Sequence, residues 1–328
     1  MARIKKAEVV IVGGGIAGLS AAIYLGRAKR DTLLIDSGKS MARWEPEVQN
    51  YLGFPGGIAG TELLRRGKRQ ANRYEIRFET DLISWARKRN GHFHLKGEKQ
   101  SYICKCLLLA TGIFHLPPNI PGVAPCLGHS MFFCKDCDGY RVQGKTVGIY
   151  GWNNEAVKYA LGMLLYSPCV LILTDGHSPH WDSRCERWVR EYDIPVYLGT
   201  IVRVRHRRQQ IEAFEMSDGK EVRLDALFTT RGDVYFNELA KGLGAQIDNT
   251  GEVVVDLDSR TTVAGLYAAG CVTPANCQMI IAAGQGAIAA QAINTDLLET
   301  SLASHSLRRF RERQLRTRRT RPHLVQKA

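Results

Sequence analysis

A short apolar run that leads into a glycine-rich turn constrains the fold of this chain more than any other stretch. Residues 8–12 are followed by GGGIAGLSAA, which places Gly13, Gly15 and Gly18 in the spacing GxGxxG before a run of small residues. In a Rossmann βαβ unit the first glycine allows the tight turn, the second lets the backbone approach a pyrophosphate, and the third lets the helix pack closely on the strand. The stretch therefore predicts a dinucleotide-binding turn.

The residues around this turn support the same prediction. Ile16 and Ala17 would begin the helix whose N-terminus holds the phosphate, so both are candidate cofactor-binding residues. A second apolar run, residues 32–35, ends at Asp36, about twenty residues further on, where an acidic side chain can accept the hydroxyl groups of an adenosine ribose. Strand, turn, helix, strand and acid thus follow one another in the order that a dinucleotide site requires.

A second strand, turn and helix pattern begins near residue 146, but its turn has lost the glycines. We expect strands over residues 146–150 and 169–174 with a helix over 155–166 between them. Asn153 stands where glycine would let the backbone meet a pyrophosphate, and Glu155 adds a negative charge at the helix N-terminus. No arginine pair follows the second strand to bind the 2′-phosphate of NADPH. This unit is predicted to keep the nucleotide-binding fold without the nucleotide.

Two cysteines at CxxC spacing, Cys134 and Cys137, lie directly before the second unit. This spacing allows a reversible disulfide and lowers the pKa of the attacking thiol below its free value of about 8.5. Asp138 follows at once, and its carboxyl group could supply or remove the proton that accompanies thiol exchange. A zinc site is the alternative for one CxxC, but no second CxxC or HxxxH lies at zinc-finger spacing. These three residues are the predicted catalytic residues, and no metal site is predicted.

Two other stretches contribute candidates of a weaker kind. The loop VQNYLGFPGGIAG contains Asn50, which fits either a cofactor contact or a turn-forming amide. A strand expected over residues 102–110 runs into ATG, where Gly112 would let the backbone approach a ligand. In that strand Cys104 and Cys106 would share one face, which indicates core packing and not chemistry.

Length and charge restrict the class of protein. A chain of 328 residues with 45% hydrophobic content has room for two domains of about 100 to 200 residues each. Residues 303–328 hold nine Lys or Arg and one Glu, which accounts for +8 of the formal charge of +13. We expect this basic tail to be a solvated extension, with binding to nucleic acid or to a membrane surface as the alternative. Scattered cysteines and the lack of a long apolar run predict a cytoplasmic protein with no membrane association.

Taken together, the motifs resemble those of one family. GGGIAGLSAA, NYLGFPGGIAG, ATGIFHLPPNIPG, CKDCDG and GLYAAGCVTPANCQMIIAAGQGAIAA occur in the order and spacing of the low-molecular-weight thioredoxin reductases, over residues 8–298. The resemblance implies an α/β protein with two Rossmann-like nucleotide-binding domains, the first of them discontinuous, and a homodimer. An FAD-binding domain would comprise residues 1–116 and 246–302, an inserted NAD(P)-type domain with the CxxC residues 117–245, and the basic tail residues 303–328.

The resemblance also implies roles for individual residues. In that family the second cysteine faces the flavin and the first attacks the substrate disulfide, so Cys137 and Cys134 take these roles, and Asp138 matches the family's acid. The positions that match FAD contacts in the family are the pyrophosphate turn at Gly13, Gly15 and Gly18, the ribose acid Asp36, the flavin-side loop at Asn50, the ATG turn at Gly112, and Gln278 and Met279 at the flavin ring.

Three departures from the family pattern affect the predicted function. The NADPH turn is altered around Asn153, the arginine clamp is missing, and the family's Gly-Asp near the flavin reads Gly270, Cys271. The lost carboxylate removes one charge-assisted hydrogen bond to FAD, which would weaken binding or change the flavin potential. In the first two departures this sequence resembles members of the family that have lost the NADPH site. Those members take electrons from ferredoxin or another flavin.

The leading hypothesis is therefore an FAD-dependent disulfide oxidoreductase that passes electrons through Cys134 and Cys137 to thioredoxin or a similar protein, from a donor other than NADPH. Three alternatives remain. They are an ordinary NAD(P)H-dependent thioredoxin reductase, a ferredoxin or flavodoxin oxidoreductase that does not use the disulfide, and a protein that binds nucleic acid or a membrane surface through its tail.

Overall fold

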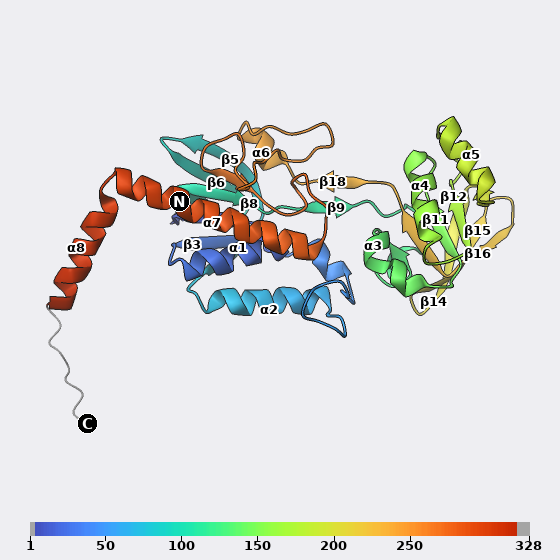
Figure 1. Cartoon of the computed structure of the whole chain (residues 1–328), viewed down its shortest axis with the longest axis horizontal. Coiled ribbons are helices and arrows are strands. Elements are labelled where there is room, and N and C mark those ends of the chain that lie inside the picture. Colours follow the sequence, from blue (N-terminus) through green and yellow to red (C-terminus); the bar gives the residue numbers. More distant parts are fainter. Residues whose placement is uncertain (1–3, 320–328) are drawn as a thin grey trace, which may run out of the picture. The chain divides into compact units, whose positions relative to one another are not determined.

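The computed structural model describes the backbone of residues 4–319 and the side chains of residues 4–316. The chain forms two compact units (Figure 1). Unit 1 comprises Met1–Lys39, Arg66–Gly112 and Asn237–Ala328, and unit 2 comprises Ser40–Arg65 and Ile113–Phe236. Each unit contains a five-stranded parallel sheet, and the helices that connect parallel strands confirm the predicted α/β class.

Unit 1 is built on the sheet that contains the first predicted strand. In sheet order its strands are β19 (Leu266–Ala268), β8 (Cys106–Leu109), β2 (Val9–Val12), β3 (Thr32–Asp36) and β4 (Arg77–Thr80). All residues of β2 and β8 are buried, as expected for a parallel sheet covered on both faces. The helices of this unit are α1 (Ile16–Arg27), α6 (Glu238–Gly242), α7 (Met279–Ala303) and α8 (Ser306–Arg319), with α2 (Gly60–Asn72) continuing into it from unit 2.

One expected strand, over residues 102–110, is wrong, because the chain forms two strands there. β7 (Ser101–Cys104) joins a four-stranded sheet with β1 (Ile4–Lys6), β6 (His92–Gly97) and β5 (Ile83–Arg89), whereas β8 joins the five-stranded sheet. The exposed Lys105 marks the crossing, and its N–H donates to the carbonyl of Glu8 at 3.1 Å. Cys104 and Cys106 therefore lie in different sheets. Both are buried, and burial raises the pKa of Cys106 to about 11, so the prediction of core packing is confirmed.

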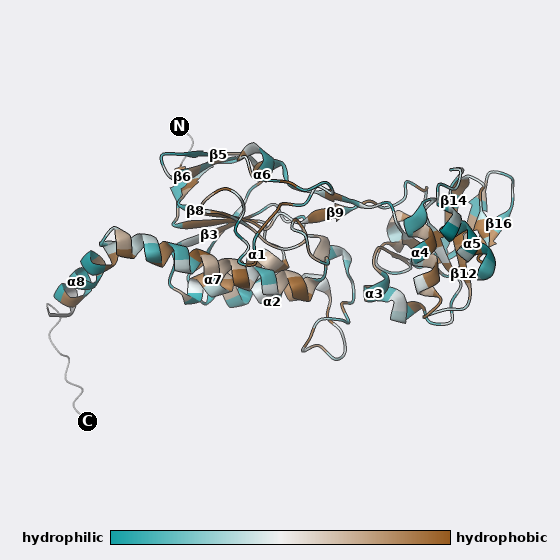
Figure 2. Ribbon diagram, turned by 45° about the horizontal axis from the view of Figure 1, so that its top comes forward, coloured by the Kyte–Doolittle hydropathy of each residue, from teal (hydrophilic) through white to brown (hydrophobic). Residues whose placement is uncertain are grey.

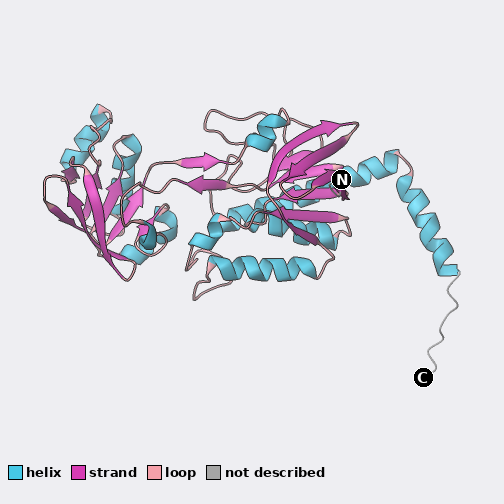
Figure 3. Ribbon diagram, turned by 180° about the vertical axis from the view of Figure 1, so that it is seen from behind, coloured by secondary structure: helices cyan, strands magenta, loops and turns pink. Residues whose placement is uncertain are grey.

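Unit 2 repeats the parallel sheet with shorter strands. In sheet order they are β10 (Met131–Phe132), β17 (Ala226–Thr229), β11 (Val147–Tyr150), β12 (Val170–Leu173) and β13 (Val196–Tyr197). A three-stranded antiparallel sheet, β14 (Ile201–Arg207), β15 (Gln210–Met216) and β16 (Glu221–Arg223), and an antiparallel pair, β9 (Ile113–His115) with β18 (Asp233–Tyr235), complete the β structure (Figure 3). Its helices are α3 (Lys135–Asp138), α4 (Asn154–Met163) and α5 (Ser183–Glu191).

The basic tail continues as helix α8, whose residues are largely hydrophilic (Figure 2). Nearly all of its described side chains are exposed, and Arg308 pairs with Glu312 at 3.2 Å. Among the residues that the structure describes, no helix combines the length and apolar character that a membrane span needs.

Candidate functional site

Gly13 lies directly after β2 in a conformation that favours glycine. Its φ is +111°, and a Cβ added there would lie 2.1 Å from the carbonyl oxygen of Ala110. The Gly13 N–H donates to the carbonyl of Ile35 at 2.8 Å, which ties the turn to β3. A side chain at this position would push the turn away from the segment after β8, so the turn depends on glycine.

The N-terminus of α1 offers its backbone N–H groups to an anion. Its N-cap residue, Gly15, supplies no capping side chain, and its first turn contains no acidic residue. A Cβ on Gly18 would lie 1.9 Å from the carbonyl oxygen of Gly13, so only glycine lets the helix pack this closely on the turn. Ile16 and Ala17 begin the helix, where the N–H groups and the helix dipole favour phosphate.

Asp36 ends β3 beside this turn, as the sequence predicts. Its Oδ1 accepts a hydrogen bond from the Gly14 N–H at 3.1 Å. A Cβ on Gly14 would lie 2.6 Å from the Asp36 Cγ, so the missing side chain is what allows this approach. The carboxylate has a second oxygen, Oδ2, to which a ribose hydroxyl could donate.

Two segments from the C-terminal part of unit 1, α7 and the loop before it, pack against the start of α1. α7 lies beside α1 (Figure 1), and a Cβ on Gly286 would lie 2.1 Å from the carbonyl oxygen of Ala17. Gly270 has a φ of +83°, and a Cβ added there would lie 3.0 Å from the Ala17 Cβ. Gln278 is the N-cap of α7 and Met279 is its first residue. The structure thus brings Gly270 to the start of α1 and places Gln278 and Met279 at a second helix N-terminus of the same unit.

The two remaining cofactor candidates lie in different units. Gly112, with a φ of +69°, is the last residue of its segment in unit 1. Asn50 is exposed and lies in unit 2, in a loop closed by a backbone bridge between Val48 and Ile58. Asn50 therefore belongs to a different compact unit from the glycine turn.

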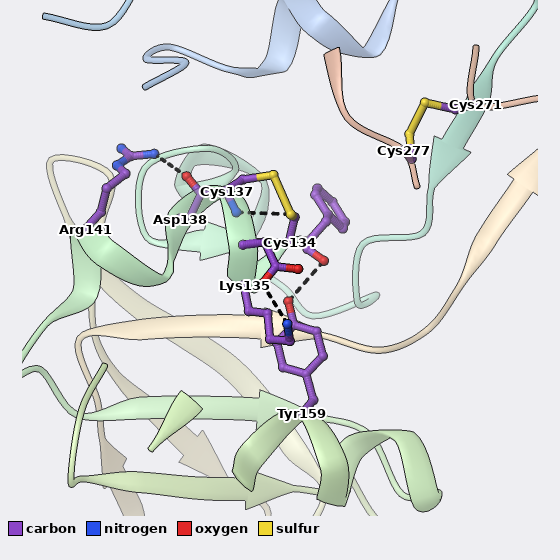
Figure 4. The surroundings of a disulfide bond; sticks show 10 residues. Cys134, Lys135, Cys137, Asp138, Arg141, Tyr159, Cys271 and Cys277 are labelled. Carbon is purple, nitrogen blue, oxygen red and sulfur yellow. Dashed lines mark hydrogen bonds and ion pairs between the residues drawn. A yellow bond between two sulfur atoms is a disulfide. The ribbon is translucent and has the colours of Figure 1, made fainter. Parts of the chain in front are cut away.

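Cys134 and Cys137 form a disulfide in unit 2 (Figure 4). Cys134 is the N-cap of α3, and its Sγ accepts a hydrogen bond from the Cys137 N–H at 3.2 Å. Such a hydrogen bond stabilises the charged form of a thiol, so it would favour the thiolate of Cys134 after reduction. Among residues 4–316 the structure contains no group of three His, Cys, Asp or Glu side chains placed to hold a metal ion.

Asp138 is buried next to this pair and carries an ion pair with Arg141. The Arg141 Nη1 donates to the Asp138 Oδ1 at 2.7 Å, and the Nη2 donates to the Gly128 carbonyl at 3.3 Å (Figure 4 shows the ion pair). Burial raises the pKa of Asp138, while Arg141 acts in the opposite direction. The carboxyl group is therefore one that can hold a proton more readily than an exposed aspartate.

Glu45 is a second acid in the same part of unit 2. Burial, and then the negative charge of Asp138, raises the pKa of Glu45 to about 7, although Arg141 and His115 lower it. His115 in turn stacks on Phe133, the residue before Cys134, with 4.9 Å between ring centroids. The surroundings of the disulfide thus contain two carboxyl groups with raised pKa values.

The second turn, after β11, is occupied by the protein's own groups. The side chain of Asn153 caps α4 by accepting from the Ala156 N–H at 3.1 Å. The His180 N–H donates to the Trp152 carbonyl at 2.6 Å, and the Trp152 ring stacks on His177 with 3.8 Å between ring centroids. A surface pocket of about 460 Å³ remains here, lined by Asn153, Asn154, Glu155, Lys158 and His180. The N-terminus of α4 is thus capped by an asparagine side chain, and the segment after β12 is hydrogen-bonded across the turn beside this pocket.

A family model described as pyridine nucleotide-disulphide oxidoreductase matches residues 7–290. The chain belongs to this family. This disulphide oxidoreductase is 30% identical over 294 residues to the thioredoxin reductase of Treponema pallidum (strain Nichols), a match that covers 87% of this chain and 95% of that protein. These likenesses confirm the resemblance to the low-molecular-weight thioredoxin reductases, and the chain is a thioredoxin-reductase-like flavoprotein that acts on sulfur groups.

Two solved structures show the same fold. The putative thioredoxin reductase TrxB of Bacillus anthracis has a TM-score of 0.83 and 25% identity, covering 90% of this chain and 99% of that one. The atypical thioredoxin reductase TRi of Desulfovibrio vulgaris Hildenborough has a TM-score of 0.51 and 30% identity, covering 89% and 98%.

The sequence prediction missed three features of this disulphide oxidoreductase. Arg141 lies three residues after Asp138, a helical spacing that could have suggested the ion pair. Glu45 gives no local signal, because its environment comes from residues about ninety positions away in the chain. Cys271, where the sequence lacks the family's carboxylate, forms a disulfide with Cys277 that was not predicted. Two cysteines within one short loop were the available signal for that bond.

Proposed function

We propose that this oxidoreductase binds FAD and uses the Cys134–Cys137 pair to reduce the disulfide of thioredoxin or a similar protein, with an electron donor other than NADPH. The observation that carries the donor proposal is the occupied N-terminus of α4, where Asn153 caps the helix and His180 is bonded across the turn. A pyrophosphate at this position would have to displace both contacts and would lie beside the carboxylate of Glu155.

The residues of unit 1 fit FAD. Gly13, Gly15 and Gly18 leave room for the pyrophosphate, and Asp36 fits the adenosine ribose. Gly270, Gln278 and Met279 would face the rest of the cofactor, with Gly112 as a further contact, and the role of Asn50 stays a prediction from the sequence. Bound FAD would supply two electrons to the disulfide at a time.

The chain's own residues then carry out thiol–disulfide exchange. With the pair reduced, the Cys134 thiolate attacks the disulfide of the partner, and one partner sulfur leaves as a thiolate. The Cys137 thiolate then attacks the Cys134 Sγ, which releases the second partner sulfur and restores the Cys134–Cys137 disulfide. The partner gains two electrons and two protons. The hydrogen bond from the Cys137 N–H to Cys134 supports the choice of Cys134 as the attacking sulfur.

We assign proton transfer in these steps to Asp138. Its burial favours the protonated carboxyl, and Arg141 stabilises the carboxylate after the proton has left. This combination suits a group that gives a proton to a departing thiolate and takes one back from the incoming thiol.

A small acidic electron carrier such as ferredoxin fits the charge of the protein, and a second flavin is the other candidate donor. The formal charge of +13 would attract an acidic protein and speed its association, an effect that falls with salt. We also propose a homodimer, as the family resemblance implies, and a cytoplasmic location, as the scattered cysteines suggest. The domain boundaries predicted from the sequence remain part of this proposal.

Anaerobic reduction of the flavin tests the donor. The flavin-loaded protein is mixed with NADPH, with NADH, or with reduced ferredoxin, and the flavin absorbance is followed. We expect bleaching with ferredoxin and none with micromolar NADPH. Rapid bleaching by NADPH would refute the donor proposal. Cys134→Ser should abolish thioredoxin reduction while the flavin can still be reduced, and continued turnover would remove Cys134 from the mechanism.

A further inference from the structure

A second disulfide joins Cys271 and Cys277 in the loop between β19 and α7 of unit 1, with 4.9 Å between the Cα atoms. The five described cysteines outside the two disulfides are free thiols, and four of them are buried. The Cys271–Cys277 pair differs from these thiols in its bond, and from Cys134–Cys137 in its place beside a predicted cofactor site. The proposed reaction makes no use of it.

One end of this disulfide is open to another molecule. Cys277 is exposed, whereas Cys271 is only partly exposed. Cys277 lies immediately before Gln278, the N-cap of the 25-residue helix α7. A thiolate at such a position is stabilised by the helix dipole, so Cys277 is suited both to be attacked and to leave as a thiolate.

The loop has an anchor that does not involve the disulfide. The Thr273 hydroxyl is buried, donates to the Gly270 carbonyl at 2.8 Å and accepts from the Gln285 Nε2 at 3.1 Å. The Gln285 Oε1 accepts from the Gly270 N–H at 2.9 Å. These bonds hold the start of the loop to α7. Opening the disulfide would release only the exposed second half of the loop, so the bond can break and reform without loss of the fold.

We propose that Cys271–Cys277 is a second redox-active disulfide, reduced by a protein dithiol. A thiolate of the dithiol attacks the exposed Cys277 Sγ, which forms a mixed disulfide and releases Cys271 as a thiolate. The second thiol of the dithiol then attacks its own bonded sulfur and releases Cys277. Two electrons and two protons pass to the pair, and the dithiol becomes a disulfide. Each chain would then hold two separate two-electron sulfur pairs.

Reduction of the Cys271–Cys277 disulfide would affect the predicted cofactor-binding residues at the start of α7. The released half of the loop ends next to Gln278, the N-cap of α7, whereas the anchored half keeps Gly270 in place. The state of the disulfide would therefore change the order of Gln278 and Met279 without disturbing the glycine turn of α1.

The test uses the full chain with both Cys134→Ser and Cys137→Ser. Because this variant lacks the first disulfide and is reduced by added thioredoxin, the result does not depend on which donor reduces the flavin. This variant, kept folded, is treated with reduced thioredoxin, alkylated with excess reagent at neutral pH without denaturant, and digested, and the labelled cysteines are quantified by mass spectrometry. We expect Cys271 and Cys277 to be unlabelled before treatment and to gain label at least about tenfold after it, because an exposed sulfur is open to exchange.

Two other cysteines serve as internal standards in every sample. The exposed Cys169 should be labelled throughout and the buried Cys104 should stay unlabelled until the protein is unfolded. Labelling of Cys271 and Cys277 only after unfolding would overturn the proposal, because the bond would then be structural. Finding both as thiols that do not pair when oxidised thioredoxin is added would overturn it as well. Failure of the proposed donor would leave all of these readings unchanged.

Discussion

The turn after β2 and the turn after β11 follow the same strand, turn and helix architecture and differ in what fills the helix N-terminus. At α1 the N-cap is Gly15, which offers no side chain, whereas at α4 it is Asn153, whose side chain accepts the Ala156 N–H. One backbone donor of the kind that a phosphate would use at the first turn, the Ala156 N–H, is taken by the protein itself at the second.

The acids that follow the next strand differ in the same way. Asp36 accepts one hydrogen bond, from the Gly14 N–H, and no group among the described residues donates to its Oδ2. Asp175 uses both oxygens, since Oδ2 accepts from the Tyr150 hydroxyl at 2.8 Å and Oδ1 accepts from the Ile201 N–H at 2.7 Å. The comparison shows that the same nucleotide-binding fold can persist when its helix N-terminus and the acid after the next strand form hydrogen bonds within the protein.

The second fold survives because its core does not depend on the turn. Four residues of α4 that face the sheet are fully buried, namely Ala156, Val157, Ala160 and Met163. They pack in the same cluster as Val147 and Ile149 of β11. Burial of apolar surface, and not the turn, therefore holds this helix to its sheet.

The largest expected effect is that of Gly18→Ala. The added Cβ would lie 1.9 Å from a backbone oxygen of the turn, which cannot move as a side chain could. We expect loss of bound flavin and a destabilisation of at least about 3 kcal/mol. Flavin content after gel filtration and thermal unfolding measure the two effects.

The matched control for this change is Gly151→Ala in the second turn. Its Cβ would first meet the Thr230 Oγ1, a side-chain atom, at 2.2 Å. Flavin content should stay at the wild-type level even if some stability is lost. A Gly18→Ala protein that retains its flavin would break the comparison between the turns.

The paired variants Asp36→Asn and Asp175→Asn come next in size. Loss of the Asp36 charge should weaken FAD binding about tenfold, because a charge-assisted hydrogen bond to the ribose is replaced by a neutral one. Asp175→Asn should leave FAD affinity unchanged and lower the free energy of unfolding by about 1 kcal/mol, because its partners are internal. Flavin titration and urea unfolding separate the effects, and the reverse pattern would contradict them.

The pH dependence of stability tests whether unit 2 contains an acid with a raised pKa, Glu45, at a site other than its degenerate turn. The folded state raises the pKa of Glu45 from 4.5 to about 7, so it binds the proton more tightly than the unfolded chain. The contribution of Glu45 to stability should therefore fall as pH rises from 4.5 through 7, by about 3 kcal/mol.

The variant Glu45→Gln cannot ionise at this position and should lose this part of the pH dependence. Its stability relative to wild type should therefore increase from pH 5 to pH 8, two values on either side of the folded-state pKa of about 7. The exposed Glu47→Gln, two residues along, is the control. Urea unfolding at both pH values provides the measurement. Parallel curves for wild type and Glu45→Gln would show that Glu45 titrates normally.

The smallest effect is expected for Asn153→Gly, which restores a glycine at the second turn. Glycine in place of an asparagine N-cap costs only a few tenths of a kcal/mol. NADPH should still fail to reduce the flavin, because the bond from His180 to the Trp152 carbonyl and the Trp152–His177 stack remain. Restored NADPH oxidation by this single change would show that Asn153 alone closes the site.

Local sequence patterns predicted the structural elements that depend mainly on residues close together in the sequence. The glycine spacing predicted the first turn, and the apolar runs predicted β2, β3 and β11, because strand and turn preferences act over a few residues. The change of sheet at Lys105 could not be predicted, since alternation continues through it. The raised pKa of Glu45 and the Cys271–Cys277 bond depend on the tertiary path of the chain, which no short window contains.

The packing of α1 against α7 has a consequence for biosynthesis. Ala17 meets Gly286, and Arg30 donates to Asn294 at 2.7 Å, so α1 acquires α7 as its neighbour only after the residues of unit 2 have been synthesised. Unit 2, which ends at Phe236, is complete well before that moment. The unit that carries Cys134 and Cys137 is thus made before α7 can pack beside the glycine turn, so the proposed coenzyme site would be completed only after the disulfide unit.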